Sequence, residues 1–152
     1  MFVSETIIDA LVESLENADF EDEVALLGEQ QPALFTYIYS EDFELFTDNE
    51  KDLLLYIVLV LYRSVEKVRG EIPPLSKKAL EDAEEVNWER LDKVTSKKFR
   101  DRMDIFFDEY DQEDLLAFVE DNLVEDDDDK QITKEGREPL FVALKSIIDV
   151  IK

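Results

Sequence analysis

The chain has 152 residues, and its 40 acidic and 17 basic side chains give it a net charge of −23. It contains no Cys and no His, which excludes thiolate nucleophiles, Ser-His-Asp triads and the zinc and iron sites that need Cys or His ligands. The charge also opposes binding to nucleic acid and to anionic membranes, so we expect neither as a partner. The length suits one domain, and we expect residues 1–152 to form a single acidic, all-helical domain.

Helix signals begin near the N-terminus. Ser4 is a suitable N-cap for a first helix, in which apolar residues recur three and four positions apart between Ile7 and Leu15. Residues 20–28 predict a second helix, and Pro32 suits the first turn of a third.

The strongest helix signal is the segment 47–50, Thr-Asp-Asn-Glu, which is typical of a capping box. Gly70, followed by two prolines, ends the helix that this box begins. Residues 53–62 are apolar on every face of that helix, and such a helix needs neighbours on all sides. We therefore predict a central helix over about residues 48–69. We expect nearly complete burial of Leu54, Ile57, Val58 and Leu61.

The second half of the chain continues in the same pattern. Ser76 predicts the start of a helix that runs to about residue 92, and Ser96 the start of the next. Apolar spacing indicates a further helix over 115–123, and Thr133 begins the last one. The sequence thus predicts an all-α bundle of about six to seven helices around the central helix, with no strand.

No membrane span is expected. The longest apolar run, residues 53–62, has ten residues, whereas a spanning helix needs about 20. The first residues carry no positive charge, unlike the start of a secretory signal. We expect a cytoplasmic protein, either a monomer or a homodimer, without a membrane partner.

Charge is distributed unevenly along the chain. Residues 1–50 contain 14 acids and no base, residues 103–129 contain 13 acids and no base, and residues 93–102 contain five bases and one acid. Either the basic island offsets an acidic neighbour within the fold, or the surface is dipolar and its acidic parts steer a partner. The second interpretation predicts that the two acidic blocks lie side by side.

Four residues are candidates for contact with a partner. Asp108, Asp111 and Asp114 lie within the second acidic block and are expected to contribute to the steering face. Trp88, on a charged helix, is either a core residue or a partly exposed anchor, because Trp is favoured at interface hot spots.

An enzymatic alternative rests on four carboxylates. Glu81 and Glu84 are three residues apart, as are Asp101 and Asp104, so each pair shares one helix face. Two helices that turn back on one another would offer four oxygen ligands to Mg²⁺, which would be the cofactor. This spacing is similar to the ExxE…ExxD pattern of all-α nucleotide pyrophosphohydrolases, except that Asp101 replaces a Glu. The resemblance implies a Mg²⁺-dependent pyrophosphohydrolase; the other interpretation is a solvated face in an acid-rich chain.

Residues 125–135 resemble an EF-hand calcium loop in which two positions have been lost. Lys130 replaces the turn glycine, and Gly136 stands where the bidentate Glu is required. Only weak, nonspecific binding of divalent cations is expected there.

The lack of common catalytic residues and the uneven charge together favour a protein that is not an enzyme. We predict an acidic interaction protein without a cofactor: an inhibitor, immunity-type or accessory protein for a basic partner. A nucleic-acid-mimicking inhibitor is a further alternative, which requires rows of acids at the spacing of phosphates.

Overall fold

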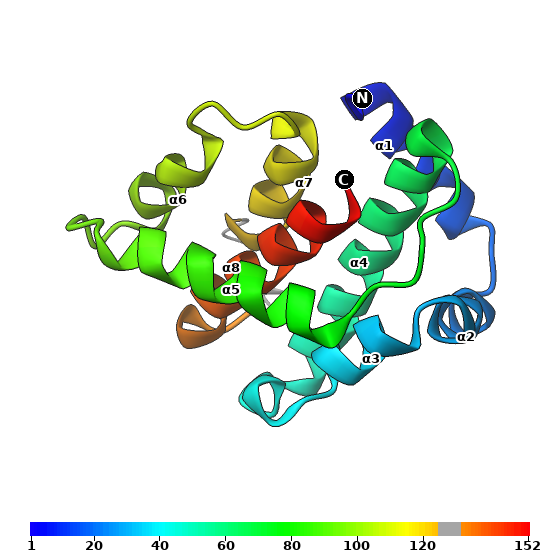
Figure 1. The fold of residues 1–152 in the computed structure, drawn as a ribbon, viewed down its shortest axis with the longest axis horizontal. Helices are drawn as coiled ribbons and strands as arrows, with labels where there is room; N and C mark the ends of the chain where they lie inside the picture. Colours follow the sequence, from blue (N-terminus) through cyan, green and yellow to red (C-terminus); the bar gives the residue numbers. More distant parts are fainter. Residues whose placement is uncertain (125–131) are drawn as a thin grey trace.

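The computed structural model describes residues 1–124 and 132–152, and within them it contains eight α-helices, one short 3₁₀ helix and no strand (Figure 1). The all-α prediction is confirmed, with one or two more helices than expected. The elements are α1 (Glu5–Glu16), α2 (Phe20–Gln30), α3 (Pro32–Ile38), η1 (Glu41–Phe43), α4 (Asp48–Arg69), α5 (Lys77–Asp92), α6 (Phe99–Phe107), α7 (Glu113–Val124) and α8 (Lys134–Ile151).

The predicted central helix is α4, and its bounds are those expected. The Thr47 hydroxyl accepts a hydrogen bond from the Glu50 amide at 3.1 Å, and the Glu50 carboxylate accepts one from the Thr47 amide at 2.9 Å. Gly70 ends the helix with φ at 95°, a backbone conformation that favours glycine. Full burial is confirmed at the four predicted positions, which are 2% exposed or less: Leu54, Ile57, Val58 and Leu61.

Burial around α4 is less even than predicted. Residues 57–62 are all buried, but Leu53, Leu55 and Tyr56 are only half-buried. The helices that pack on α4 are α1, α2 and α8. They leave one side of its first turns partly open to solvent.

A second helix, α8, is buried as deeply as α4. Residues 140–148 are all buried, and α4, α5 and α7 cover them. Figure 1 shows α5 crossing α8, with α6 at one end of the long axis of the molecule and α2 at the other. The bundle therefore has two central helices instead of one.

Most predicted caps are confirmed. Ser4, Ser76 and Thr133 each accept a hydrogen bond from a backbone amide in the first turn of the following helix. Ser96 is an exception, because α6 begins only after Lys98, and the Ser96 hydroxyl accepts from the Lys98 amide instead.

The N-terminal ends of α4 and α8 meet at one carboxylate. Besides closing the α4 cap, Glu50 accepts hydrogen bonds from the backbone amide and the hydroxyl of Thr133, both at 3.0 Å, and it is 1% exposed. Negative charge is favourable at the N-termini of helices, and here two termini share it. A Cβ atom at Gly136 would overlap this carboxylate, so a larger residue there would displace Glu50 from its hydrogen bonds.

Among the described helices, none is both long enough and apolar enough to cross a membrane.

We expect Leu61→Ala to lower the free energy of unfolding by about 2–5 kcal/mol, because Leu61 is fully buried and its loss leaves a cavity. Leu26→Ala is the matched control: Leu26 is 45% exposed, and the change should cost less than about 0.5 kcal/mol. Urea unfolding followed by circular dichroism measures both. Equal losses in the two variants would show that α4 is not a core helix.

Candidate functional site

The four carboxylates of the enzymatic alternative do not come together. Glu81 and Glu84 lie in the first half of α5, whereas α6 meets α5 near its last turn, where Arg90 donates to the Ile105 carbonyl at 2.8 Å. The rise from Glu84 to Arg90 is about 9 Å along a helix. Nowhere in residues 1–124 and 132–152 do three acidic side chains lie close enough to share a metal ion.

Each of these two pairs has a different neighbour instead. Glu84 accepts a hydrogen bond from the Tyr37 hydroxyl at 2.6 Å, and Asp101 accepts one from Ser96 at 3.4 Å. Asp104 is exposed on α6. The Mg²⁺ site therefore gains no support from the geometry.

Glu84 lies in an unfavourable place for a charge. Partial burial raises the pKa of Glu84; Asp42 and Glu81 raise it further, and the hydrogen bond from Tyr37 opposes the shift. Burial also raises the pKa of the Tyr37 hydroxyl, and the neighbouring Glu84 carboxylate adds to this shift. The Glu84 carboxylate is thus short of positive counter-charge.

Trp88 lies one turn further along α5, at a hollow of about 300 Å³. Trp88 is half-buried and packs against the core. It is therefore partly a core residue, and it also keeps the exposed surface expected of an anchor for a partner. The hollow, which we call the Trp88 hollow, is formed by Glu41, Asp42, Phe43, Leu45, Phe46, Glu84, Trp88 and Pro139.

Two of the three aspartates expected on the steering face also have partners inside the molecule. Asp111 accepts from the Lys152 ammonium at 2.6 Å, and this hydrogen bond lowers the pKa of Asp111. Asp114 accepts from the Glu5 amide at 2.9 Å, at the start of α1. Asp108 is exposed just after α6. Substitutions at Asp111 and Asp114 therefore remove contacts within the molecule as well as surface charge.

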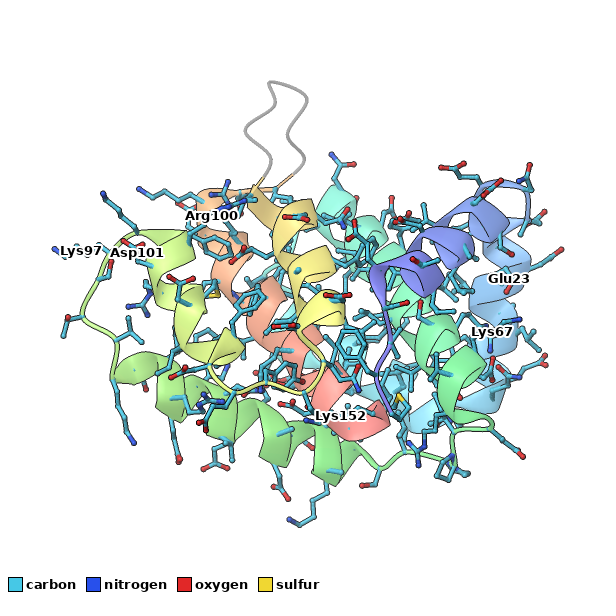
Figure 2. All side chains as sticks on the ribbon, turned by 90° about the horizontal axis from the view of Figure 1, so that it is seen from above. Glu23, Lys67, Lys97, Arg100, Asp101 and Lys152 are labelled. Carbon is cyan, nitrogen blue, oxygen red and sulfur yellow. The ribbon has the colours of Figure 1, made fainter. Side chains whose placement is uncertain are left out.

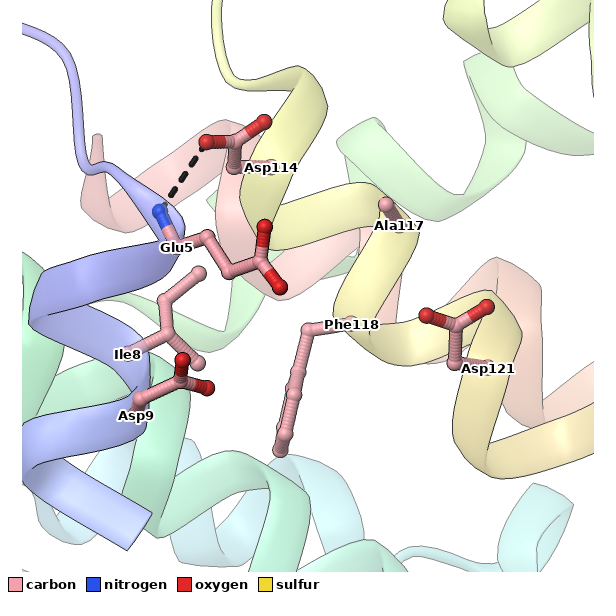
Figure 3. A pocket seen from close by; sticks show the side chains of 7 residues that line it. All are labelled: Glu5, Ile8, Asp9, Asp114, Ala117, Phe118 and Asp121. Carbon is pink, nitrogen blue, oxygen red and sulfur yellow. Dashed lines mark hydrogen bonds between the residues drawn. The ribbon is translucent and has the colours of Figure 1, made fainter.

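The helices of the two acidic blocks lie side by side where α1 meets α7 (Figure 3). A groove of about 180 Å³ separates them, and we call it the acidic groove. Every charged residue along it is an acid, and Phe118 and Ile8 supply apolar surface between them. Its lining consists of Glu5, Ile8, Asp9, Asp114, Ala117, Phe118 and Asp121.

The basic island lies at the α6 end of the molecule. Figure 2 shows Lys97, just before α6, and Arg100, on α6, on the other side of the view from Glu23 on α2. One residue of this island is paired within the fold: Arg102 forms a bidentate ion pair with Glu138, with N–O distances of 2.9 and 3.1 Å. Lys97 and Arg100 are exposed. Exposed bases are not confined to this end, because Lys67 on α4 lies beside Glu23 at the other end of the view.

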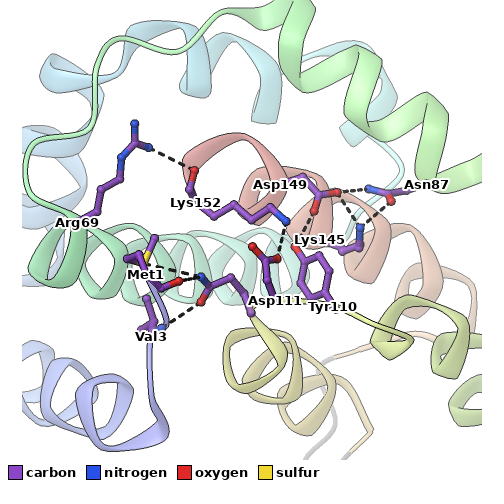
Figure 4. Close-up of polar contacts among 10 residues, drawn as sticks. Met1, Val3, Arg69, Asn87, Tyr110, Asp111, Lys145, Asp149 and Lys152 are labelled. Carbon is purple, nitrogen blue, oxygen red and sulfur yellow. Dashed lines mark hydrogen bonds and ion pairs between the residues drawn. The ribbon is translucent and has the colours of Figure 1, made fainter.

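A buried polar cluster joins α5, α8 and the turn before α7 (Figure 4). The Lys145 ammonium, in a side chain that is 4% exposed, donates to Asn87 at 3.0 Å and to Asp149 at 2.8 Å. The Tyr110 hydroxyl donates to Asp149 at 2.6 Å, and Asn87 donates to Ser146 at 2.9 Å. Burial lowers the pKa of Lys145, while Asp149 opposes the shift.

Sequence reasoning missed this cluster. The available signal was a lysine inside the apolar run of α8, with an aspartate four residues later. The rings of Tyr110 and Phe106 lie 4.6 and 5.5 Å from the Lys145 nitrogen. One of its hydrogen bonds reaches Asn87 on α5 and the other stays within α8 at Asp149, so Lys145 links α8 to α5.

The EF-hand-like segment falls mainly on residues 125–131, outside the described residues. Comparisons with protein-family models, with curated proteins and with solved structures found no match for this chain.

Removal of the acidic partner from the buried cluster should be strongly destabilising. We expect Asp149→Ala to cost about 3–5 kcal/mol of unfolding free energy, because it leaves the Lys145 charge buried without its counter-ion. Lys145→Met should cost less, since Asn87 and Tyr110 still donate to Asp149. Urea unfolding of both single variants and the double variant measures the coupling energy between Lys145 and Asp149. If the losses of the two single variants simply add in the double variant, the two side chains are not coupled and the prediction is wrong.

Glu84→Gln should raise the stability at pH 7 and flatten its dependence on pH. The raised pKa means that the folded state binds more protons than the unfolded state just above the ordinary carboxyl range. Stability therefore falls as pH rises through the folded pKa, and a neutral side chain removes this loss. Urea unfolding at about pH 5 and pH 7 measures it. Glu85→Gln, at an exposed site on the same helix, is the control, and an equal change there would refute the prediction.

Proposed function

We propose that this chain is a non-enzymatic acidic interaction protein that binds a basic protein partner, as an inhibitor, immunity-type or accessory protein does. The observation that carries the proposal is the acidic groove, where the only charged residues along the lining are acids from α1 and α7. The proposal places the protein in the cytoplasm, whose reducing conditions a chain without cysteine tolerates.

The charge of the groove suits a basic partner for two reasons. First, a concave surface lined by one sign of charge focuses the electric field and raises the association rate of an oppositely charged partner. Second, Phe118 gives the aliphatic stem of a Lys or Arg side chain an apolar surface, while the carboxylates receive its charged end. Asp114 also bonds the start of α1, whereas Asp9 and Asp121 are exposed acids that contribute little to stability and are available to a partner.

The test compares two charge-reversal variants of equal net charge. Asp9→Lys with Asp121→Lys changes two exposed acids of the groove, and Glu29→Lys with Glu71→Lys changes two exposed acids that line neither this groove nor the Trp88 hollow. The probe is fluorescein-labelled deca-arginine, with deca-glutamine as the uncharged control. Stopped-flow association is measured at about 0.01 M and 0.1 M salt, where the Debye length is about 30 and 10 Å.

We expect the groove variant to slow association at low salt by about tenfold, which lies within the range of electrostatic steering, and the Glu29/Glu71 variant to slow it much less. Salt should remove most of the difference. Equal slowing in both variants would show that the charge acts only through its total, and the proposal would fail.

A further inference from the structure

We infer that the Trp88 hollow is the docking site for a cationic amphipathic helix of the basic partner. This inference rests on the proposed function and adds to it a second contact site, separate from the acidic groove, and the form of the segment recognised there. In this arrangement an apolar side chain of the helix packs against Trp88 and Leu45, and a Lys or Arg one turn away meets Asp42 and Glu84.

The floor of the hollow is apolar and already formed. The Phe43 and Phe46 rings are 4% and 5% exposed and meet edge to face, with centroids 5.5 Å apart. The Tyr37 ring packs on Phe43 in the same manner at 5.0 Å. Because these rings already pack on one another, a ligand does not have to order them, which lowers the conformational entropy lost on binding.

The rim offers apolar side chains that are still partly in water. Leu45 is 59% exposed, and Trp88 is half-buried. Tryptophan is enriched among residues that dominate binding energy, especially where it lines a pocket beside polar groups. A ligand that covers these two side chains would remove their apolar surface from water, which adds to the binding free energy beyond the electrostatic attraction.

The charges around the hollow require a positive partner. Glu41, Asp42 and Glu84 are its charged residues, and all are acids. Glu84 is half-buried beside Asp42 and Glu81, so a cation placed there would relieve an existing repulsion. The same three acids also line an adjoining hollow, which contains the exposed base Lys77. Lys77 does not line the Trp88 hollow itself.

Other occupants fit the hollow less well. A second copy of this chain brings a further net charge of −23, and a nucleic acid brings phosphates; both meet repulsion at an acidic rim. A segment that is only polar and basic leaves Trp88 and Leu45 in water. A helix with leucines on one face and arginines beside them satisfies both the apolar surface and the charge.

The sole tryptophan makes the test direct, because Trp88 fluorescence reports on this hollow alone. The probe is an amphipathic Leu/Arg peptide of about 18 residues, five helical turns. An isomer of the same composition, with its leucines spread over all faces, is the control for charge. Affinity is measured by titration, and the self-association of the protein by sedimentation.

Two pairs of variants separate the hollow from the rest of the acidic surface. Leu45→Ser is matched by Leu26→Ser, at a leucine that is 45% exposed on α2. Asp42→Asn is matched by Asp22→Asn, at an exposed acid of α2. All four positions are at the surface, and circular dichroism checks that each variant folds.

The amphipathic peptide should shift Trp88 emission to shorter wavelength and bind at least about tenfold more tightly than its isomer, a difference of about 1.4 kcal/mol. Leu45→Ser and Asp42→Asn should each weaken binding of this peptide several-fold, and their controls should not.

If both peptides bind equally without a Trp88 shift, or if the control variants weaken binding as much, the inference is overturned while the proposed function stands. If neither peptide binds at low salt, both fail. Self-association that shifts Trp88 emission would assign the hollow to a second copy and also overturn the inference.

Discussion

The need to cover two apolar helices determines the rest of this structure. Residues 57–62 of α4 and residues 140–148 of α8 are buried on all sides, and each helix covers the other on one side only. The remaining sides require α1 and α2 on α4, and α5 and α7 on α8. Each of these outer helices keeps a face in water, which is free to carry charge. The acidic surface is therefore built on helices whose inner faces are fixed by the core.

Local signals predicted the helices well because their causes are local. The capping box at Thr47 and the glycine at Gly70 act within a few residues, and they set both ends of α4 correctly. The junction between α2 and α3 was harder. Gln31 separates the two helices and is 1% exposed; it donates to the Tyr62 hydroxyl and to two carbonyls after α4, and it accepts from the Leu75 amide. These partners lie 31–44 residues away, so no local pattern indicates that a glutamine is buried there.

The functional residues were predictable in part, for a related reason. Helical spacing fixes which side chains share a face, so Glu81 and Glu84 were correctly placed together on one helix. It does not fix where the next helix crosses, and α6 meets α5 near Arg90, beyond the reach of these carboxylates. The charge blocks identified acidic segments, but only the path of the chain brings α1 beside α7. Lys145 was missed because its partner on α5, Asn87, is 58 residues away.

The hydrogen bond between Glu50 and Thr133 joins two helices that are synthesised at different times, so α4 exists before the helix that covers it. The α4 cap needs only neighbouring residues, so it can form as soon as α4 leaves the ribosome, whereas the contact with Thr133 closes a loop across 83 positions. The first residue of α8 follows Arg69 by 65 residues, which takes roughly 3–13 s at about 5–20 residues per second. Throughout that interval the nascent chain carries the uncovered side of α4, an apolar surface of the kind that chaperones bind. The last helix is thus both a part of the core and the event that ends this exposure.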